Sequence, residues 1–268
     1  MSAGPNRCPI TYQIIPQGER YSLEGLKKLS RGLRHLENLP LSAQEQRIEA
    51  RKRATKMSIQ GVQPKLSAKL SAAKARFEIV DTGGTFILKP PHELYPNLPE
   101  NEDLSMHLAV AAGIEVPLHG LLYSKDGSRT YFIKRFDRFA HKGKIPVEDF
   151  AQLSGKTRET KYNSSMEQLA KVIDQFCTFP LLEKRKLLLR ALFNFLIGNE
   201  DMHLKNYSLI TRDGKIELAP AYDFLNSSIM LENSAEQSAL PLRGKKRKLS
   251  RKDWIDYYAL EPLALRRE

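Results

Sequence analysis

The chain has 268 residues, and Lys and Arg outnumber Asp and Glu by 43 to 31, which gives a formal net charge of +12. A hydrophobic content of 41% and a charged content of 28% are typical of a globular protein in water, and the length permits one large domain or two lobes. No apolar run approaches the roughly 20 residues that span a bilayer, and the N-terminus lacks a secretory signal. We therefore expect a cytoplasmic protein without a membrane partner. Its basic charge favours acidic partners such as nucleotides, nucleic acids or acidic proteins.

The two cysteines, Cys8 and Cys177, lie far apart in the sequence. They predict neither a disulfide framework nor a complete zinc site. This cysteine usage fits a reducing compartment, where disulfides are rare.

The first half of the chain is predicted to be a small sheet accompanied by helices. The expected elements are, in order, an irregular start (1–22), two polar helices (23–38 and 42–56), two strands (77–80 and 85–89), a helix (102–112) and two more strands (118–123 and 131–136). The turn residues Asp81–Gly84 predict that the first two strands form a hairpin. Gly113 is expected to end the helix before it.

The second half is predicted to be mainly helical. The expected elements are helices at 147–153, 164–177 and 181–197, a polar loop, and strands at 206–212 and 215–219. Asp213-Gly214 between these strands is a strong hairpin signal. The hairpin would carry the chain from Asn206 to Asp223 so that both can face one cleft. Trp254, Tyr257 and Tyr258 follow at helical spacing and are expected in the core.

The polar loop Asn199–Asn206 carries the clearest chemical signal. It places Asp201 and Asn206 five positions apart, the spacing found in protein-kinase catalytic loops. Phosphoryl transfer uses one carboxylate to orient the attacking hydroxyl, and an amide oxygen with a second carboxylate to hold Mg²⁺. Asp223 supplies that second carboxylate, although Leu225 stands where a D-F-G motif has glycine. The sequence thus predicts an ATP-dependent kinase with ATP and Mg²⁺ as cofactors, against the plainer interpretation of solvated loop residues.

Lys89 ends the apolar strand before the predicted helix that begins at Asn101 and Glu102. Kinases pair a strand lysine on the nucleotide phosphates with a helix acid. The plainer alternatives are a lysine that reaches from the strand to solvent and an acid that stabilises the first turn of a helix. The order of the motifs favours the ion pair.

Two further segments carry weaker signals. The loop Ser58–Lys65 precedes the lysine strand and has one glycine, Gly61, so it matches no glycine-rich phosphate-loop pattern; its backbone amides can still cradle phosphates. The basic run Arg243–Lys248 is usually a solvated face. Contact of this run with nucleic acid is the alternative.

Taken together, the motifs resemble a known family. The matching segments are Ser58-Ile59-x-Gly61-Val62-Gln63-Pro64-Lys65, Ile87-Leu88-Lys89-Pro90, Glu100-Asn101-Glu102, Lys134-Arg135-Phe136-Asp137-Arg138, Asn199-x-Asp201-x-His203-x-Lys205-Asn206 and Tyr222-Asp223. In this order they resemble the HipA-type Ser/Thr kinase toxins of bacterial toxin–antitoxin modules. Each motif alone is weak, but together they are specific and cover most of the chain.

The resemblance implies an α+β, bilobed, protein-kinase-like fold. A polar helical segment (1–56) would pack on a small β-rich N-lobe (57–137), followed by a helical C-lobe (138–268). The implied sites are Asp201 as catalytic acid/base, Asn206 and Asp223 on Mg²⁺, Lys89 with Glu102 on the ATP phosphates, Gln60, Gly61, Val62, Gln63, Pro64 and Lys65 as the phosphate loop, Lys134, Arg135 and Phe136 at the adenine, and His203 and Lys205 beside the phosphates.

The resemblance also implies regulation and partners. Family members autophosphorylate a serine that corresponds to Ser58, which ejects the loop; the added charge beside bound triphosphate makes this plausible physically. Only 57 residues precede that serine, so the chain is most similar to HipT, the short kinase of three-component systems. The expected partners are a HipS-like protein and a DNA-binding HipB-like antitoxin, with DNA reached only through the antitoxin. The expected substrate is an aminoacyl-tRNA synthetase, with tryptophanyl-tRNA synthetase favoured.

Two other functions remain open from the sequence. The net charge of +12 also fits a DNA-associated regulatory or corepressor subunit that joins an antitoxin. A small-molecule kinase could use the same phosphotransfer residues, but the Ser-Ile-x-Gly loop argues against it.

Overall fold

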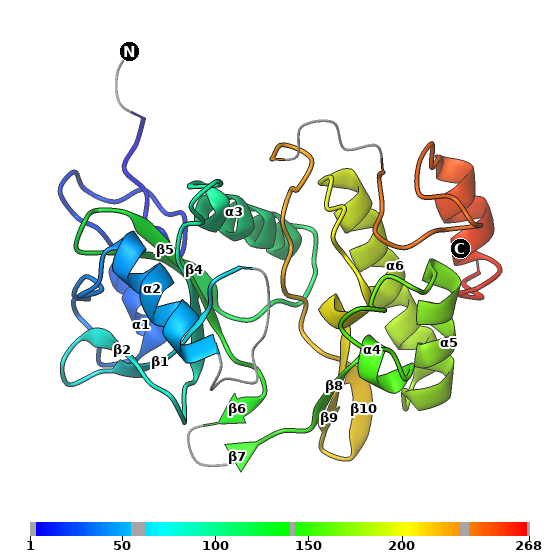
Figure 1. The fold of residues 1–268 in the computed structure, drawn as a ribbon, viewed down its shortest axis with the longest axis horizontal. Coiled ribbons are helices and arrows are strands. Elements are labelled where there is room, and N and C mark those ends of the chain that lie inside the picture. The colour runs from blue at the N-terminus through cyan, green and yellow to red at the C-terminus, as the bar shows by residue number, and fades with distance from the viewer. Residues whose placement is uncertain (1–3, 55–62, 140–142, 231–235, 267–268) are drawn as a thin grey trace. The chain divides into compact units, whose positions relative to one another are not determined.

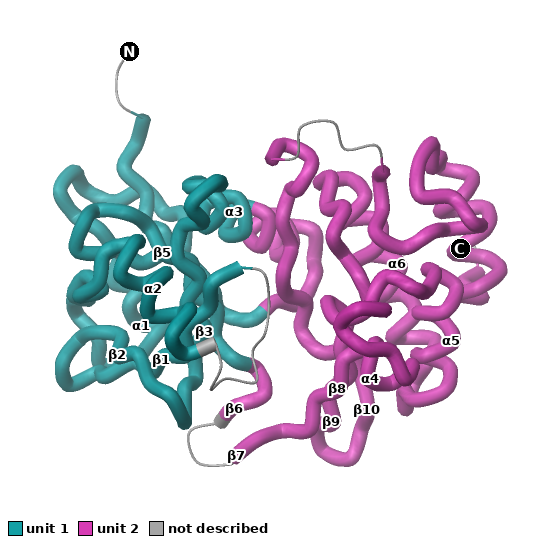
Figure 2. Tube along the Cα trace, in the orientation of Figure 1, with its two compact units in different colours: residues 1–104, 117–135 teal, residues 105–116, 136–268 magenta. Residues whose placement is uncertain are grey.

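The computed structural model describes residues 4–54, 63–139, 143–230 and 236–266. The chain divides into two compact units, one formed by residues 1–104 and 117–135 and the other by residues 105–116 and 136–268 (Figure 2). We call them unit 1 and unit 2 and describe each by itself. Ser58 and the loop residues Gln60, Gly61 and Val62 lie outside the described residues.

Unit 1 contains a five-stranded antiparallel sheet (Figure 1). Its strands are β1 (Leu66–Ser71), β2 (Arg76–Ile79), β3 (Phe86–Lys89), β4 (His119–Tyr123) and β5 (Arg129–Lys134), in the order β2-β1-β3-β5-β4. The expected hairpin across Asp81–Gly84 was wrong, because β1 lies between β2 and β3 and pairs with both. The sequence hid β1 because its small and polar residues lack the β-branched pattern of a strand.

The helices of unit 1 begin with α1 (Leu23–Leu29) and α2 (Ala43–Ala54). The helix expected over 23–38 ends early, since Ser30 adopts an extended backbone and caps α1. Leu33, Leu36 and Leu39 imitate helical spacing, but they extend the core instead. That core joins the first fifty residues to the sheet through side chains such as Leu26 and Phe77.

The third helix, α3 (Leu98–Ala111), begins earlier than its polar residues suggested. Pro99 lies in its first turn, where proline fits because the first amides of a helix have no partner within it. Gly113 follows the helix at a φ of +78° and ends it as expected. The boundary between the two units crosses this helix after Leu104.

Unit 2 combines helices with a small sheet (Figure 1). Its elements are β6 (Arg138–Phe139), β7 (Gly143–Lys144), β8 (Val147–Asp149), α4 (Phe150–Leu153), α5 (Met166–Phe176), α6 (Pro180–Leu196), the 3₁₀ turn η1 (Leu204–Asn206), β9 (Ser208–Arg212), β10 (Lys215–Leu218) and the π-helix η2 (Lys252–Ala259). The hairpin of β9 and β10 is confirmed, and β8 adds to it in the order β10-β9-β8.

The helix expected over 147–153 was wrong in its first half. Residues 147–149 form β8, and Asp149 then caps α4 with its side chain. Gln152 returns a bond to the Asp149 backbone, which completes a capping box. This cap marks the true start of the helix in the sequence.

Amphipathic helices form the core of unit 2. Leu169 and Ile173 of α5 are buried, as is Leu187 of α6. Trp254 and Tyr258 are buried as expected, whereas Tyr257 is only partly buried. No helix in the described part of the chain is both long and apolar enough to cross a membrane.

Candidate functional site

In unit 1, the residue that ends β3 meets the helix acid. Lys89 and Glu102 are 3% and 2% exposed, and Lys89 Nζ lies 2.5 Å from Glu102 Oε1. The same ammonium lies 5.6 Å from the centre of the Tyr131 ring, on the neighbouring strand β5. A cation is therefore held at a fixed position on the sheet by an acid and an aromatic face.

A buried ion pair of this kind is not an efficient source of stability. Desolvation of both charges offsets most of their attraction, and a well-packed apolar pair often does as well. Loss of one partner, in contrast, costs about 3–5 kcal/mol because the other charge remains buried. The Lys89–Glu102 pair is thus better explained by a need for charge at this position than by folding.

The described part of the expected phosphate loop leads directly into β1. Gln63, Pro64 and Lys65 are partly buried. The side-chain nitrogen of Gln63 is buried without a hydrogen-bond partner among the described residues. A buried donor without a partner is costly, so this amide is available to an acceptor such as a phosphate oxygen.

The expected adenine-binding segment follows β5. The Lys134 amide donates to the Leu118 carbonyl, and the Arg135 amide donates to the Thr85 carbonyl. Both amides are therefore already used by the protein. In unit 2, Phe136 stacks on Tyr222 with ring centres 5.8 Å apart.

In unit 2, a buried asparagine ties the polar loop to the segment that carries Asp223. The Asn199 side chain donates to Asn194 Oδ1 at 2.8 Å and to the Asp223 carbonyl at 3.3 Å. Gly198 precedes it at a φ of +70°, where an added Cβ would come 2.4 Å from Ser228 Oγ. The sequence indicated Asn199 only as part of the motif, yet its side chain bonds directly to the segment that carries Asp223.

Asp201 is exposed at its side chain but fixed at its backbone. Its amide donates to Asn199 Oδ1 at 3.2 Å, and its carbonyl accepts from Asn206 Nδ2 at 3.1 Å. That last bond uses the nitrogen of Asn206, so it leaves the amide oxygen, the type of atom that Mg²⁺ prefers, for another partner. The five-residue spacing of Asp201 and Asn206 therefore closes a compact loop.

Asp223 has a left-handed backbone with a φ of +58°. Aspartate tolerates this region better than most residues, and such strain in non-glycine residues is concentrated at functional sites. The side chain is partly buried. Asp223 and Asp201 both act electrostatically on the His203 imidazole, so the loop and the segment after the hairpin bring two acids to one histidine.

His203 is buried and feels the charges of both acids. Burial lowers the pKa of its imidazole, and the negative charges of Asp201 and Asp223 partly oppose this shift. Its Nδ1 is buried without a hydrogen-bond partner among the described residues. A neutral imidazole with an unused nitrogen can donate to or accept from a bound ligand.

Lys205 was expected beside the nucleotide phosphates, but its side chain pairs with Asp149. Its Nζ donates to Asp149 Oδ2 at 2.7 Å, and its carbonyl accepts from the Tyr222 hydroxyl at 3.0 Å. The residue therefore joins η1 to the cap of α4. Its expected place beside the phosphates stays a prediction.

The sequence missed Tyr162, which lies in the loop between α4 and α5. Its hydroxyl donates to Asp201 Oδ1, and its ring meets His203 edge to face at 5.0 Å. Burial and the neighbouring Asp201 charge raise the pKa of this phenol, so it stays a donor at neutral pH. No spacing rule links the two residues, which are 39 positions apart.

The donors of unit 2 suit a magnesium ion. Mg²⁺ is held by oxygen atoms, usually one or two carboxylates together with substrate phosphates. Asp223 offers a carboxylate and Asn206 an amide oxygen on a loop that Asn199 holds to the Asp223 segment. Soft ligands are missing from this set, since the two cysteines, Cys8 and Cys177, are buried elsewhere.

Comparison with known proteins gives consistent results. The family described as HipA-like C-terminal domain matches residues 57–267. A proposed kinase of Haemophilus influenzae is 34% identical over 241 residues, which cover 83% of this chain and 69% of that protein. The serine/threonine-protein kinase toxin HipA of Shewanella oneidensis is 29% identical over 206 residues, which cover 70% of this chain but only 47% of the toxin.

The fold also has a solved counterpart. A structure of the Shewanella oneidensis toxin–antitoxin system, which contains HipA, HipB and operator DNA, matches with a TM-score of 0.66 at 22% identity. The match covers 94% of this chain and 62% of that one. At this identity the likeness concerns the fold alone, and it confirms the expected α+β, kinase-like architecture.

Proposed function

Because the chain belongs to the HipA-like C-terminal domain family, we propose that it is an ATP-dependent protein serine/threonine kinase and the toxin of a toxin–antitoxin module. The main support is a network in unit 2. Asn199 bonds to the backbone of Asp201 and of Asp223, and Asn206 bonds to the Asp201 carbonyl. Both acids also act electrostatically on His203. The network supplies the residue types of phosphoryl transfer on a loop and on a second segment that Asn199 ties to it. Kinase relatives support the reaction class.

In the proposed reaction, Asp201 orients the hydroxyl of a substrate serine and accepts its proton. The serine oxygen forms a bond to the γ-phosphorus of ATP while the bond from that phosphorus to the β–γ bridging oxygen breaks, and ADP leaves. Tyr162 holds one oxygen of the Asp201 carboxylate by a hydrogen bond. The other carboxylate oxygen is then the one that meets the hydroxyl.

The remaining polar residues bind and orient the nucleotide in this proposal. Asn206 and Asp223 would hold Mg²⁺, which would neutralise charge on the phosphates. Lys89, kept in place by Glu102, and the neutral His203 contact phosphate oxygens. Because oriented donors in a dry site stabilise developing charge strongly, their burial supports this role.

We assign adenine to the segment after β5 and the phosphates to the loop Gln60–Lys65. Since the Lys134 and Arg135 amides are already bonded, Phe136 is the residue of the three whose amide can be offered to adenine. The exposed side chain of Lys134 does not conflict with this, because the recognition uses the backbone. Gln63 contributes its buried side-chain nitrogen.

The substrate, regulation and partners are also proposals. We favour an aminoacyl-tRNA synthetase as the substrate, and tryptophanyl-tRNA synthetase among these, in the cytoplasm where tRNA is charged. Autophosphorylation of Ser58 would switch the kinase off. A HipB-like DNA-binding antitoxin and a small HipS-like protein are the expected partners, as in the HipT type; the Shewanella structure, which holds HipA with HipB and DNA, supports the first.

Incubation of the purified chain with γ-labelled ATP and a bacterial lysate tests the proposal. We expect label in one protein band, which mass spectrometry identifies together with its phosphorylated residue, and phosphate on Ser58. A reaction without the chain is the control. Label that is no higher than in the control, at any Mg²⁺ concentration, would exclude a protein kinase; a labelled small molecule would show a metabolite kinase instead.

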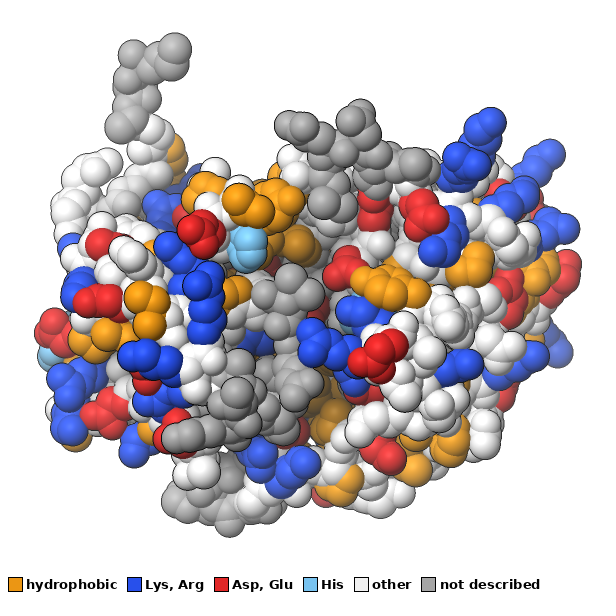
Figure 3. Space-filling view, viewed as in Figure 1, with side chains coloured by type: hydrophobic (Ala, Val, Ile, Leu, Met, Phe, Trp, Pro, Cys, Tyr) orange, Lys and Arg blue, Asp and Glu red, His pale blue; other side chains and the backbone are white. Residues whose placement is uncertain are grey.

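One observation favours a second function, direct DNA binding in an antitoxin complex. Lys and Arg side chains gather at the end of unit 2 that carries the C-terminal segment (Figure 3). Within the basic run, Lys245 pairs with Asp253 and Lys246 with Glu236, while Arg247 and Lys248 are exposed. A salt titration of operator DNA binding by the isolated chain decides: a steep loss of affinity with salt supports direct contact, and no binding at moderate salt rejects it.

A further inference from the structure

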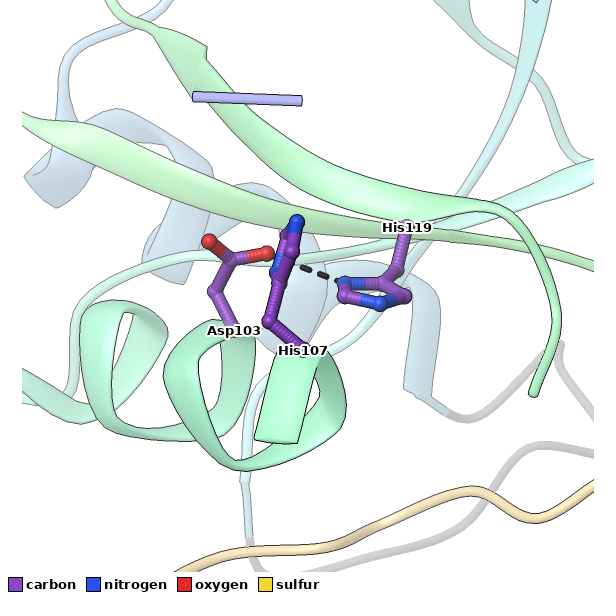
Figure 4. Close-up of side chains that lie close together, drawn as sticks. All are labelled: Asp103, His107 and His119. Atoms are coloured by element: carbon purple, nitrogen blue, oxygen red, sulfur yellow. Dashed lines mark hydrogen bonds and ion pairs between the residues drawn. The ribbon is translucent and has the colours of Figure 1, made fainter. Parts of the chain in front are cut away.

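Three side chains of types that bind metals lie close together at α3 and the start of β4, and none of them is assigned to the nucleotide (Figure 4). They are Asp103 and His107, one turn apart on α3, and His119 at the start of β4. Residues at positions i and i+4 share one face of a helix, so the helix alone brings the first two together. One ligand atom from each residue lies within 4.8 Å of the others.

We propose that Asp103, His107 and His119 form a zinc-binding site. Zinc is held by His nitrogen and carboxylate oxygen at about 2.0–2.2 Å, most often in a tetrahedron. Such a tetrahedron places ligand atoms roughly 3.3–3.5 Å apart. Asp103 Oδ1 and His119 Nδ1 are 3.0 Å apart, and the ligand atom of His107 lies within 4.8 Å of both of the others, so zinc binding would require the side chains to adjust.

The surroundings of the cluster resemble those of a metal site. Asp103 is fully buried and His119 is 5% exposed, so the ligands are shielded from water on the protein side. The second carboxylate oxygen of Asp103 accepts a hydrogen bond of 2.8 Å from the Tyr12 hydroxyl. Metal-binding side chains typically have such an outer partner that fixes their orientation. His107 is only partly buried, which leaves a route for the ion.

The types of ligand atom in the cluster indicate which metal ion it would bind. Two imidazoles and one carboxylate suit zinc or a neighbouring transition metal, whereas Mg²⁺ prefers an all-oxygen set. Three protein ligands leave a fourth position for water. The site is therefore chemically distinct from the oxygen-rich set of Asn206 and Asp223.

The position of the site suggests what zinc would do. Asp103 follows Glu102, the partner of Lys89, so zinc would fasten this turn of α3 to β4. That consequence rests on the proposed kinase function, while zinc binding itself does not. Failure of zinc binding would leave the kinase proposal untouched, and failure of the kinase assay would leave the zinc site untouched.

Zinc titration of the metal-free, full-length chain against a chromophoric chelator, with excess Mg²⁺ and no nucleotide, tests the inference. We expect one equivalent of bound zinc and a higher melting temperature with zinc. His107→Ala should weaken binding at least 100-fold. Tyr12→Phe, which removes only the outer hydrogen bond, should weaken it about 10-fold. The variant of an exposed histidine outside the cluster, His35→Ala, and Asp223→Asn should bind zinc as the wild type does.

A second measurement covers the case in which a variant folds poorly. Co²⁺ bound to two imidazoles and a carboxylate gives visible absorption bands, which we expect in the wild type and in His35→Ala but not in His107→Ala. Circular dichroism checks that each variant is folded. The inference is overturned if the wild type binds no stoichiometric zinc, if His107→Ala binds zinc like the wild type, or if His35→Ala loses binding equally.

Discussion

The two units handle charge in opposite ways. In unit 1, Lys89 and Glu102 are almost fully buried and satisfy each other. In unit 2, Asp201 is exposed and Asp223 sits on a strained backbone. A buried pair holds one charge in a set position, whereas an exposed acid such as Asp201 keeps its carboxylate within reach of a substrate. Binding and chemistry thus make different demands on the fold, and substitutions can separate them.

The largest effect is expected at Asp223. Asp223→Asn should lower phosphotransfer by about 1000-fold, because the proposed Mg²⁺ site loses a carboxylate while the side-chain shape is kept. Asp213→Asn is the matched control: Asp213 also has a positive φ, of +48°, but lies in the turn between β9 and β10. Initial rates at several Mg²⁺ concentrations measure the effect, and equal rates in both variants would remove Asp223 from the site.

The next largest effect is expected at the Lys89–Glu102 pair, where substitutions should change stability and kinase activity separately. Lys89→Met should lower the free energy of unfolding by about 3–5 kcal/mol, since Glu102 is left charged and buried. The double variant Lys89→Met/Glu102→Leu should recover most of that stability but no kinase activity. Urea unfolding and phosphotransfer rates test both statements. Recovery of activity in the double variant would show that the lysine serves only the fold.

A smaller effect is expected at Tyr162. Tyr162→Phe should reduce kcat about 10-fold, or about 1.4 kcal/mol in activation free energy, because the Asp201 carboxylate loses the bond that orients it. Nucleotide affinity should not change. A faster variant would show instead that the phenol blocks Asp201 in the free protein.

The pH dependence of stability should report on His203. Burial lowers the pKa of its imidazole, so the unfolded chain binds more protons than the folded one below the ordinary value of about 6.5. Its contribution to stability is complete above that pH and is lost as the pH falls below it. Urea unfolding at pH 7.5 and 5.5 should therefore show a smaller drop for His203→Gln than for the wild type. An identical drop would show that the histidine is not desolvated.

The smallest effect is expected at Arg190 on α6. This side chain is 4% exposed, and its Nε and Nη2 have no hydrogen-bond partner among the described residues. Arg190→Met should leave the free energy of unfolding unchanged or raise it by about 1 kcal/mol, because an apolar chain replaces a desolvated charge whose buried Nε and Nη2 are unsatisfied. A loss of more than about 3 kcal/mol in thermal or urea unfolding would reveal a partner for this guanidinium.

The sequence predicted the features that depend on residues close together in the chain, and it missed those that depend on distant segments. The Asp201–Asn206 loop and the β9–β10 hairpin depend on short spacings and turn residues, which are visible along the chain. The strand β1 was missed because its pairing with both β2 and β3 is set by distant segments. The first half of the helix expected at 147–153 was wrong for a related reason. Residues 147–149 form a strand because they pair with β9, which is distant in the sequence.

The same rule applies to the site. Residue types and spacing indicated Lys89, Glu102 and the acids of unit 2. Tyr162 and Asn199 act through contacts across 39 and 24 positions, and no sequence pattern encodes such distances. Asp103 and His119, 16 positions apart, likewise appear as a pair only in the folded chain.

The most direct test of the account is the transfer of labelled γ-phosphate by the wild type, Asp201→Asn and Glu200→Gln. Glu200 is the adjacent acid, and its backbone amide donates to Ser227 Oγ, a bond that Glu200→Gln keeps, so this variant is the matched control. We expect normal transfer in Glu200→Gln and none in Asp201→Asn, with ATP binding by a fluorescent analogue retained in both. Sustained transfer by Asp201→Asn would contradict the assignment of this loop as the catalytic centre.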